Sequence, residues 1–214
     1  MSEEIKPVKN YVFYDFVRIT ALPGLLVFRP KLVYENEKAK EKLRGGALLI
    51  ANHAGFWDPI YLMLSIRYRR HHFVCIKDFF EGNRLKRWLF RHFHCIPIDR
   101  ENFSMNSLRR ITDELKAGRL VDMFPEGHVN AGENLAPFKS GMILLSLQSA
   151  CPIVPVYIKP PANILHRLVV AVGEPVDVKA LFGQKPSLAE IDEAAEMLRE
   201  KEEKLHKLCV PDNN

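Results

Sequence analysis

The segment Ala47-Leu-Leu-Ile-Ala51, followed by Asn52-His-Ala-Gly-Phe-Trp-Asp58-Pro59, decides how this chain is predicted to fold. The apolar run of five residues predicts a strand. A strand that ends at Ala51 brings His53 to the edge of a sheet, and Asp58 then opens the following helix. The segment therefore predicts a histidine and an aspartate close together at one sheet edge.

On both sides of this segment the chain alternates between strand and helix patterns. Apolar runs predict strands at 47–51, 72–76, 95–98, 120–124, 152–158 and 168–172, and helical patterns lie near 58–66, 84–93, 104–117 and 139–149. A final helix begins at Ser187, whose spacing to Glu190 forms a capping box, and ends near Leu208. This alternation predicts a single three-layer α/β domain with a largely parallel mixed sheet flanked by helices. Ligands bind beyond the carboxyl ends of the strands in such sheets.

Length and composition agree with a globular protein. The chain has 214 residues, 47% of them hydrophobic, so it contains enough apolar surface for one substantial core. Its four cysteines lack the spacing of a metal motif, and we expect neither disulfides nor structural zinc, as in a reducing cytosolic compartment. The charged start Met-Ser-Glu-Glu-Ile-Lys predicts no cleavable signal peptide.

Residues 11–28 form the most apolar stretch of the chain. Asp15, Arg18 and the Pro23-Gly24 break argue against a membrane-spanning helix. The stretch predicts an amphipathic helical segment, either lying in a membrane interface or packed on the core of the domain. We therefore divide the chain into an N-terminal apolar segment, 1–34, and a main domain, 35–214.

Basic residues are concentrated between positions 67 and 100. Although the whole chain has a formal charge of +5, this stretch alone holds nine Lys and Arg residues and three acids, a net +6. It predicts either an attachment site for an anionic surface, such as a membrane leaflet or an acidic carrier protein, or an ordinary solvated face. No nucleic-acid-binding motif is present in the sequence, so we do not expect a nucleic-acid partner.

His53 and Asp58 have the composition of a general base and the residue that orients it. A carboxylate five positions away can fold back onto the imidazole, fix its tautomer and stabilise its protonated form. The alternatives are a structural histidine and an N-cap aspartate. Because neither this segment nor Phe124-Pro-Glu-Gly-His128 offers a serine or cysteine nucleophile, the proton that His53 removes is predicted to come from a substrate hydroxyl.

Four motifs, which follow one another along the chain, resemble those of a known family. The Asn-His-x-x-x-x-Asp-Pro motif, Ile-Asp99-Arg100, Phe124-Pro-Glu-Gly127 and Val154-Pro155-Val156 resemble the glycerolipid acyltransferases, and most closely the lysophosphatidate acyltransferases. The resemblance covers residues 25–175 and implies that an acyl group moves from acyl-CoA or acyl-ACP, as substrate, to a lysophospholipid hydroxyl. It implies no cofactor and no metal. The expected location is peripheral, at the cytoplasmic face of an anionic membrane, with acyl carrier protein as a candidate partner.

The resemblance also assigns the site. It makes His53 and Asp58 the catalytic pair, and the Val154-Pro155-Val156 motif shapes the acyl tunnel or the sheet. Its substrate-binding residues are Asn52, Lys77, Arg100, Glu126, Gly127 and His128.

The sequence departs from this family after Gly127. Where the relatives commonly continue Thr-Arg-Ser, this chain has His128-Val129-Asn130 and so lacks an arginine suited to bind phosphate. Either another basic residue replaces it, the candidates being Lys77, Arg100, His128 and Lys139, or the acceptor is a different lysolipid. Two alternatives of other classes stay open, namely a non-catalytic lipid or acyl-carrier binding protein, and a metal-dependent hydrolase built on His53, Asp58 and His128.

Overall fold

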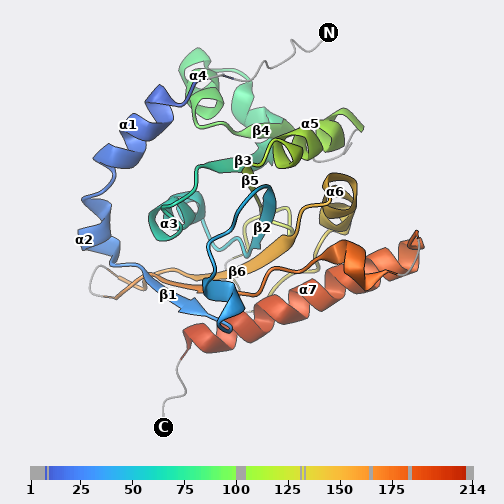
Figure 1. The fold of residues 1–214 in the computed structure, drawn as a ribbon. Coiled ribbons are helices and arrows are strands. Elements are labelled where there is room, and N and C mark those ends of the chain that lie inside the picture. Colours follow the sequence, from blue (N-terminus) through green and yellow to red (C-terminus); the bar gives the residue numbers. More distant parts are fainter. Residues whose placement is uncertain are drawn as a thin grey trace.

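A seven-stranded sheet organises the protein (Figure 1). The computed structural model describes residues 8, 10–99, 105–130, 132, 134–163, 166–182 and 185–210. The strand order is β1-β7-β6-β2-β5-β3-β4. The strands are β1 (Lys31–Tyr34), β2 (Ala47–Ala51), β3 (His71–Ile76), β4 (Ile96–Ile98), β5 (Leu120–Met123), β6 (Ile153–Lys159) and β7 (Val169–Val172).

The helices cover both faces of the sheet, as Figure 1 shows, with α3 on one side and α5, α6 and α7 on the other. They are α1 (Val12–Thr20), α2 (Gly24–Phe28), α3 (Asp58–Ser65), α4 (Arg84–His92), α5 (Met105–Lys116), α6 (Gly141–Ser149) and α7 (Leu188–Cys209). Short 3₁₀ helices lie at η1 (Lys38–Lys40), η2 (Lys77–Phe80) and η3 (Val178–Leu181). The predicted three-layer α/β fold is confirmed.

Strand β2 lies at the centre because its side chains are apolar on both faces. All five residues are buried, and they pair in parallel with β5 on one side and β6 on the other. Leu48 and Ile50 enter the core beneath α5, α6 and α7, whereas Leu49 and Ala51 enter the core beneath α3. Strands β4, β3, β5, β2 and β6 all run in one direction, so their carboxyl ends share one edge.

The capping box predicted for the last helix is present. The Ser187 hydroxyl accepts a hydrogen bond from the Glu190 N–H, and the Glu190 carboxylate accepts one from the Ser187 N–H. These two bonds satisfy N–H groups that the helix cannot pair internally. They fix the start of α7, whose buried stripe then packs along β6 and β7.

The N-terminal segment is anchored to the domain. Tyr14 of α1 is fully buried, and its hydroxyl accepts a hydrogen bond from the His71 N–H (2.8 Å). The Tyr11 hydroxyl donates to Nε2 of His72 (2.8 Å), whose pKa burial lowers to about 3, so this imidazole is neutral. Arg70 pairs with Asp15. The packed alternative is therefore observed for the inner face of α1.

The predicted division at residue 34 is wrong for its last residues. Strand β1 pairs in parallel with β7 and completes the sheet, although the sequence analysis placed residues 31–34 in the N-terminal segment. A four-residue strand that begins with lysine and is only half-buried has too weak an apolar pattern to be recognised. Within the described part of the chain, no helix has the length and apolar character needed to cross a bilayer.

Candidate active site

His53 and Asp58 meet at the carboxyl edge of the sheet, as the sequence predicts. His53 follows the end of β2, and Asp58 is the first residue of α3. The Nδ1 atom of His53 lies 2.8 Å from Oδ2 of Asp58, and the same oxygen accepts a hydrogen bond from the Gly55 N–H (2.8 Å). The Asp58 side chain caps no N–H of α3, so the alternative N-cap role is not observed.

This contact sets the tautomer of His53. A buried carboxylate only accepts hydrogen bonds, so Nδ1 carries the proton and donates it to Asp58. Nε2 then holds a lone pair, and it has no hydrogen-bond partner among the residues that the structure describes. The imidazole stacks on Phe124, with ring centroids 4.2 Å apart. The side chain of His53 is 21% exposed and that of Asp58 1%, so only the histidine is open to a substrate.

Glu126 joins the loop that follows β5 to the loop that carries His53. Its Oε1 atom accepts from the His53 main-chain N–H (3.0 Å), and its Oε2 atom accepts from Asn130 Nδ2 (2.7 Å) and the Ala136 N–H (2.9 Å). Glu126 is only 3% exposed. Its carboxylate is therefore occupied by the protein, which favours a positioning role over the predicted contact with substrate.

Asn130 makes the second link between the same two loops. Its N–H donates to the carbonyl of His53 (2.7 Å), so both main-chain polar groups of His53 are held by the 126–130 turn. The sequence analysis noted Asn130 only as part of a departure from the family pattern. Nothing local marks it as a partner of a residue 77 positions earlier, so its role becomes visible only in the fold.

Asn52 is held by the neighbouring strand. Its Oδ1 atom accepts from the Ile158 N–H (2.7 Å), and its Nδ2 group donates to the Ile158 carbonyl (3.0 Å). Asn52 is also buried. The side chain thus extends the pairing of β2 with β6, and the structure favours this role over the predicted substrate contact.

Gly127 and His128 complete the turn. Gly127 has a φ of +74°, and a Cβ built there would lie 2.9 Å from Nζ of Lys139, so the lysine side chain lies directly over the turn. Nδ1 of the exposed His128 bonds to the Glu126 carbonyl (3.0 Å), which keeps the imidazole local to the turn. Lys139, one of the basic candidates from the sequence, is thus brought against the Phe-Pro-Glu-Gly turn although it lies 12 residues beyond Gly127 in the chain.

Lys77 and Arg100 lie farther along the edge. Lys77 follows β3, two strands from β2, and its ammonium group pairs with Asp99 (2.6 Å), which raises its pKa. Arg100 lies outside the described residues. The structure therefore brings together five residues, namely His53, Asp58, Glu126, Gly127 and Lys139. Lys77 lies at the same edge of the sheet but at the end of β3, two strands from β2.

The basic stretch 67–100 is less free than its charge suggests. Arg69 donates to the main-chain carbonyls of Leu43, Gly45 and Gly118, and Arg70 pairs with Asp15. His71 and His72, which lie within this stretch, are buried. Nδ1 of His71 bonds to the buried Asp122; this carboxylate outweighs burial and leaves the pKa of His71 above its ordinary value. No group of three metal-binding side chains occurs among the described residues.

Glu202 of α7 lies beneath the site, and the sequence analysis did not identify it. It is fully buried, and neither carboxyl oxygen has a hydrogen-bond partner among the described residues. Burial raises its pKa well above the usual range, and the nearby Glu126 carboxylate raises it further. The main-chain N–H of Asn52 lowers the pKa of Glu202, but its effect is smaller than that of burial. Burial therefore favours the protonated form of Glu202, which lies against the two loops that carry His53 and Glu126.

Comparison with known proteins identifies this architecture. The 1-acyl-sn-glycerophosphate (LPA) acyltransferase PlsC from Thermotoga maritima has the same α/β fold in its crystal structure, with a TM-score of 0.61 and 19% identity over 97% of this chain and 86% of that chain. A sequence profile described as Acyltransferase matches residues 31–159, which is more than half of the chain. The protein belongs to the acyltransferase family, as its motifs predict.

Two bacterial proteins named 1-acyl-sn-glycerol-3-phosphate acyltransferase are similar in sequence. The one from Streptococcus pneumoniae (strain ATCC BAA-255 / R6) is 26% identical over 173 residues, which cover 78% of this chain and 64% of that protein. The one from Bacillus subtilis (strain 168) is 28% identical over 172 residues, which cover 76% of this chain and 84% of that protein. The chain thus spans less than two thirds of the streptococcal relative.

Replacing Glu202 by glutamine should stabilise the protein increasingly as pH rises. A folded-state pKa above the unfolded value means that the folded protein binds more protons, so the wild type loses stability as pH increases from about 4.5. Glutamine has no proton to lose. Urea unfolding at pH 4, 6 and 8 should show a difference between Glu202→Gln and wild type that grows by up to about 1.4 kcal/mol per pH unit.

The control is Glu200→Gln, because Glu200 is exposed on the same helix. Its stability difference from wild type should stay nearly constant over this range. A constant difference for Glu202→Gln as well would show that Glu202 ionises as an ordinary surface carboxylate.

Proposed function

We propose that the protein is a 1-acylglycerol-3-phosphate O-acyltransferase that forms phosphatidate from lysophosphatidate and an acyl thioester. The observation that carries the proposal is the His53–Asp58 contact at the sheet edge, which leaves Nε2 of His53 as an acceptor with no partner among the described residues. Family membership and the names of the relatives support the reaction and the acceptor.

His53 acts in this scheme as a general base. Its Nε2 atom takes the proton of the acceptor hydroxyl while that oxygen attacks the thioester carbonyl carbon. The new C–O bond forms and the C–S bond breaks. The leaving thiolate then takes up the proton from the imidazolium, which restores neutral His53. Asp58 stabilises the imidazolium while it exists. No acyl-enzyme is needed, so holding both substrates in one geometry supplies much of the rate.

Replacing His53 by alanine should lower kcat by about a hundredfold or more, the usual scale for the loss of a general base. Asp58→Asn should also lower kcat steeply, because the neutral amide no longer stabilises the imidazolium. The measurement is steady-state transfer of a labelled acyl group to lysophosphatidate, with circular dichroism to show that each variant is folded. Near-normal turnover in His53→Ala would rule out this mechanism and leave a binding protein or another base.

Basic residues at the same edge are the candidates to bind the acceptor phosphate. Lys139 is favoured because its ammonium group lies over Gly127, next to the turn that holds His53. Lys77 and Arg100 stay candidates from the sequence, and the ion pair of Lys77 with Asp99 counts against its availability. An amine opposite a phosphate supplies a point charge rather than the bidentate geometry of the missing arginine.

Lys139→Ala should raise the KM for lysophosphatidate by about tenfold, equivalent to the loss of about 1.4 kcal/mol of charge-assisted binding. The KM for the acyl thioester should change much less. Lys77→Ala and Arg100→Ala are measured beside it. Lys116→Ala is the control, because α5 ends at the opposite edge of the sheet. If a variant raised the KM for both substrates equally, or if none of the three variants Lys139→Ala, Lys77→Ala and Arg100→Ala changed the KM for lysophosphatidate, the phosphate would bind elsewhere.

A membrane surface is the proposed partner, and the protein would bind it peripherally at the cytoplasmic face. Helices α2, α1 and α4 follow one another along one side of the molecule (Figure 1). These three helices and the turn between α1 and α2 carry exposed apolar residues, namely Val12, Phe16, Ile19, Leu22, Leu26, Leu85, Trp88 and Leu89. Phe13 packs against Trp88 (centroids 4.7 Å apart), which joins α1 to α4.

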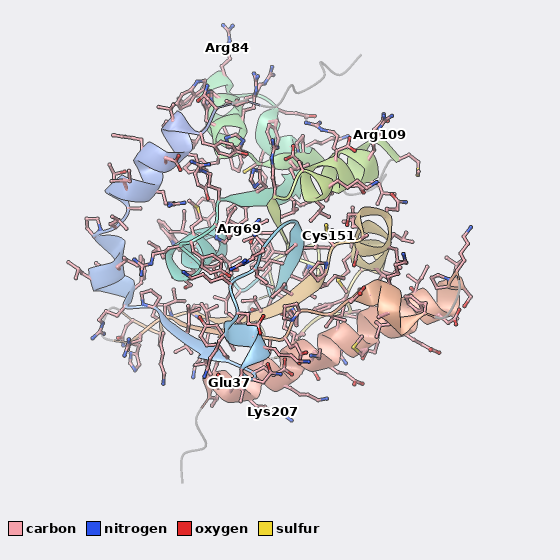
Figure 2. The ribbon with its side chains drawn as sticks, in the orientation of Figure 1. Glu37, Arg69, Arg84, Arg109, Cys151 and Lys207 are labelled. Carbon is pink, nitrogen blue, oxygen red and sulfur yellow. The ribbon has the colours of Figure 1, made fainter. Side chains whose placement is uncertain are left out.

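Two further features support this surface. Phe56 and Trp57, between His53 and Asp58, are 75% and 56% exposed, which puts aromatic side chains beside the catalytic pair. Tyr61, one turn into α3, contacts Phe28 of α2, so this loop and the N-terminal helices are neighbours. Arg84 points away from the domain at the outer end of α4 (Figure 2), where a cation suits an anionic leaflet.

Phe16→Glu should weaken binding to anionic vesicles by about tenfold or more, because it removes apolar contact and adds repulsion. Raising the salt concentration should weaken the wild type as well. Co-sedimentation with neutral and anionic vesicles measures both effects. The control is Leu188→Glu at the start of α7, because Leu188 is also a highly exposed apolar residue but lies on another element. Equal losses for the two variants, or no binding by wild type, would show that the exposed residues are ordinary surface.

A further inference from the structure

A cavity of about 500 Å³ lies at the carboxyl edge of the sheet, two strands from β2, and the proposed reaction has not used it. It lies where β6 ends and where β1 and β7 begin, close to the last turn of α7. Its volume is within the range of small-molecule sites. The lining consists of Lys31, Val33, Lys159, Pro160, Pro161, Ala162, His166, Arg167, Val169, Leu208 and Cys209.

The register of the sheet places two lysines of the cavity, Lys31 and Lys159, on the same face of the sheet. Val169 of β7 pairs with Lys31 of β1 on one side and with Lys159 of β6 on the other. Residues paired across strands point to the same face, so both lysines extend from the face that α7 covers, about 10 Å apart across two strand spacings. Val169 lies between them, and Leu208 forms part of the wall. The result is an apolar floor between two ammonium groups.

The cavity has an excess of positive charge. Arg167 adds a guanidinium group, oriented by a hydrogen bond from its Nε to the Arg29 carbonyl (3.0 Å). Lys159 donates to the Cys209 carbonyl at the end of α7 (3.4 Å). Among the described residues, no carboxylate lines the cavity and none of these three cations has an acidic partner. Three like charges around one apolar floor favour an anion with an apolar part.

The distance from His53 decides which substrate anion fits. Lys159 directly follows Ile158, the residue that pairs with Asn52, so the cavity begins beside the catalytic loop. Its centre near Val169 is nevertheless two strand spacings from β2, about 10 Å away. In lysophosphatidate the reacting hydroxyl and the phosphate are separated by only a short piece of glycerol. A hydroxyl at His53 therefore keeps the acceptor phosphate close to His53, and a phosphate in this cavity needs a longer arm.

We propose that this cavity binds the phosphate end of the phosphopantetheine arm of the acyl donor. Acyl-CoA and acyl carrier protein share that arm, which carries the thioester at one end and a phosphate at the other. The arm is flexible, long and largely uncharged between its ends, so it can cross from β7 to His53 along the carboxyl edge. This inference rests on the proposed acyl transfer and assigns the donor to one side of His53, with Lys139 and the acceptor phosphate on the other.

Calorimetric binding and steady-state kinetics with one matched pair of double variants test the assignment. Lys31→Gln/Arg167→Gln removes two cations from the cavity and leaves Lys159 in contact with α7. The control is Arg109→Gln/Lys116→Gln, which removes two cations from a second cavity of about 420 Å³ that also contains Asp113. The ligands are coenzyme A, 4′-phosphopantetheine, pantetheine without phosphate, and inorganic phosphate. Acyl-CoA and acyl carrier protein serve as donors in the kinetic assay.

The wild type and the control variant should bind 4′-phosphopantetheine at least tenfold more tightly than pantetheine, and the cavity variant should lose that difference. The cavity variant should show a KM for either donor raised about tenfold, with the KM for lysophosphatidate unchanged. Inorganic phosphate should compete only weakly.

Three results would overturn the assignment. The first is equal affinity of the wild type for 4′-phosphopantetheine and for pantetheine. The second is a cavity variant with a changed KM for lysophosphatidate and an unchanged KM for the donor. The third is competition by inorganic phosphate as strong as that by 4′-phosphopantetheine. Absence of acyl transfer by the wild type with either donor would contradict the proposed function instead, and the calorimetric comparison would still decide whether the cavity recognises the arm.

Discussion

The geometry of the candidate site depends on the hydrogen bonds that the Glu126 carboxylate accepts. Its two oxygens receive N–H groups from His53, from the Asn130 side chain and from Ala136, and these come from segments that meet only through the adjacent strands β2 and β5. A buried carboxylate without such donors costs several kcal/mol, so the loops stay where those donors are supplied. The orientation of His53 therefore follows from the position of Glu126 as much as from Asp58.

The contact between His53 and Asp58 could be predicted from the sequence because its geometry is local. His53 and Asp58 are five residues apart, between an apolar run and a helix start, so the strand-turn-helix pattern alone brings them together. The capping box of Ser187 and Glu190 was predictable for the same reason. The parallel sheet followed from alternating periodicities, although the short, half-buried β1 did not, because its four residues show too little apolar alternation.

The residues that hold the site were not predictable in the same way. Asn52, Asn130 and Glu202 act through partners that are distant in the chain, and nothing in their local sequence names those partners. The charge count of 67–100 was accurate, but it could not show that Arg69 binds main-chain carbonyls or that His71 and His72 are buried. Composition reports how many charges a segment carries, whereas only packing reports which of them face solvent.

The position of Glu202 has a consequence for the newly made chain on the ribosome. The His53–Asp58 pair, the Phe124-Pro-Glu-Gly127 turn and Lys139 are all present once residue 139 has been synthesised. Asn52 gains its partner only with β6, however, and the underside of both loops is covered only when α7 arrives. A nascent chain that ends between β6 and residue 202 therefore lacks part of the packing that holds these loops, although it contains all four sequence motifs. The candidate site therefore gains the packing beneath it only when the last helix has been synthesised and the fold is almost complete.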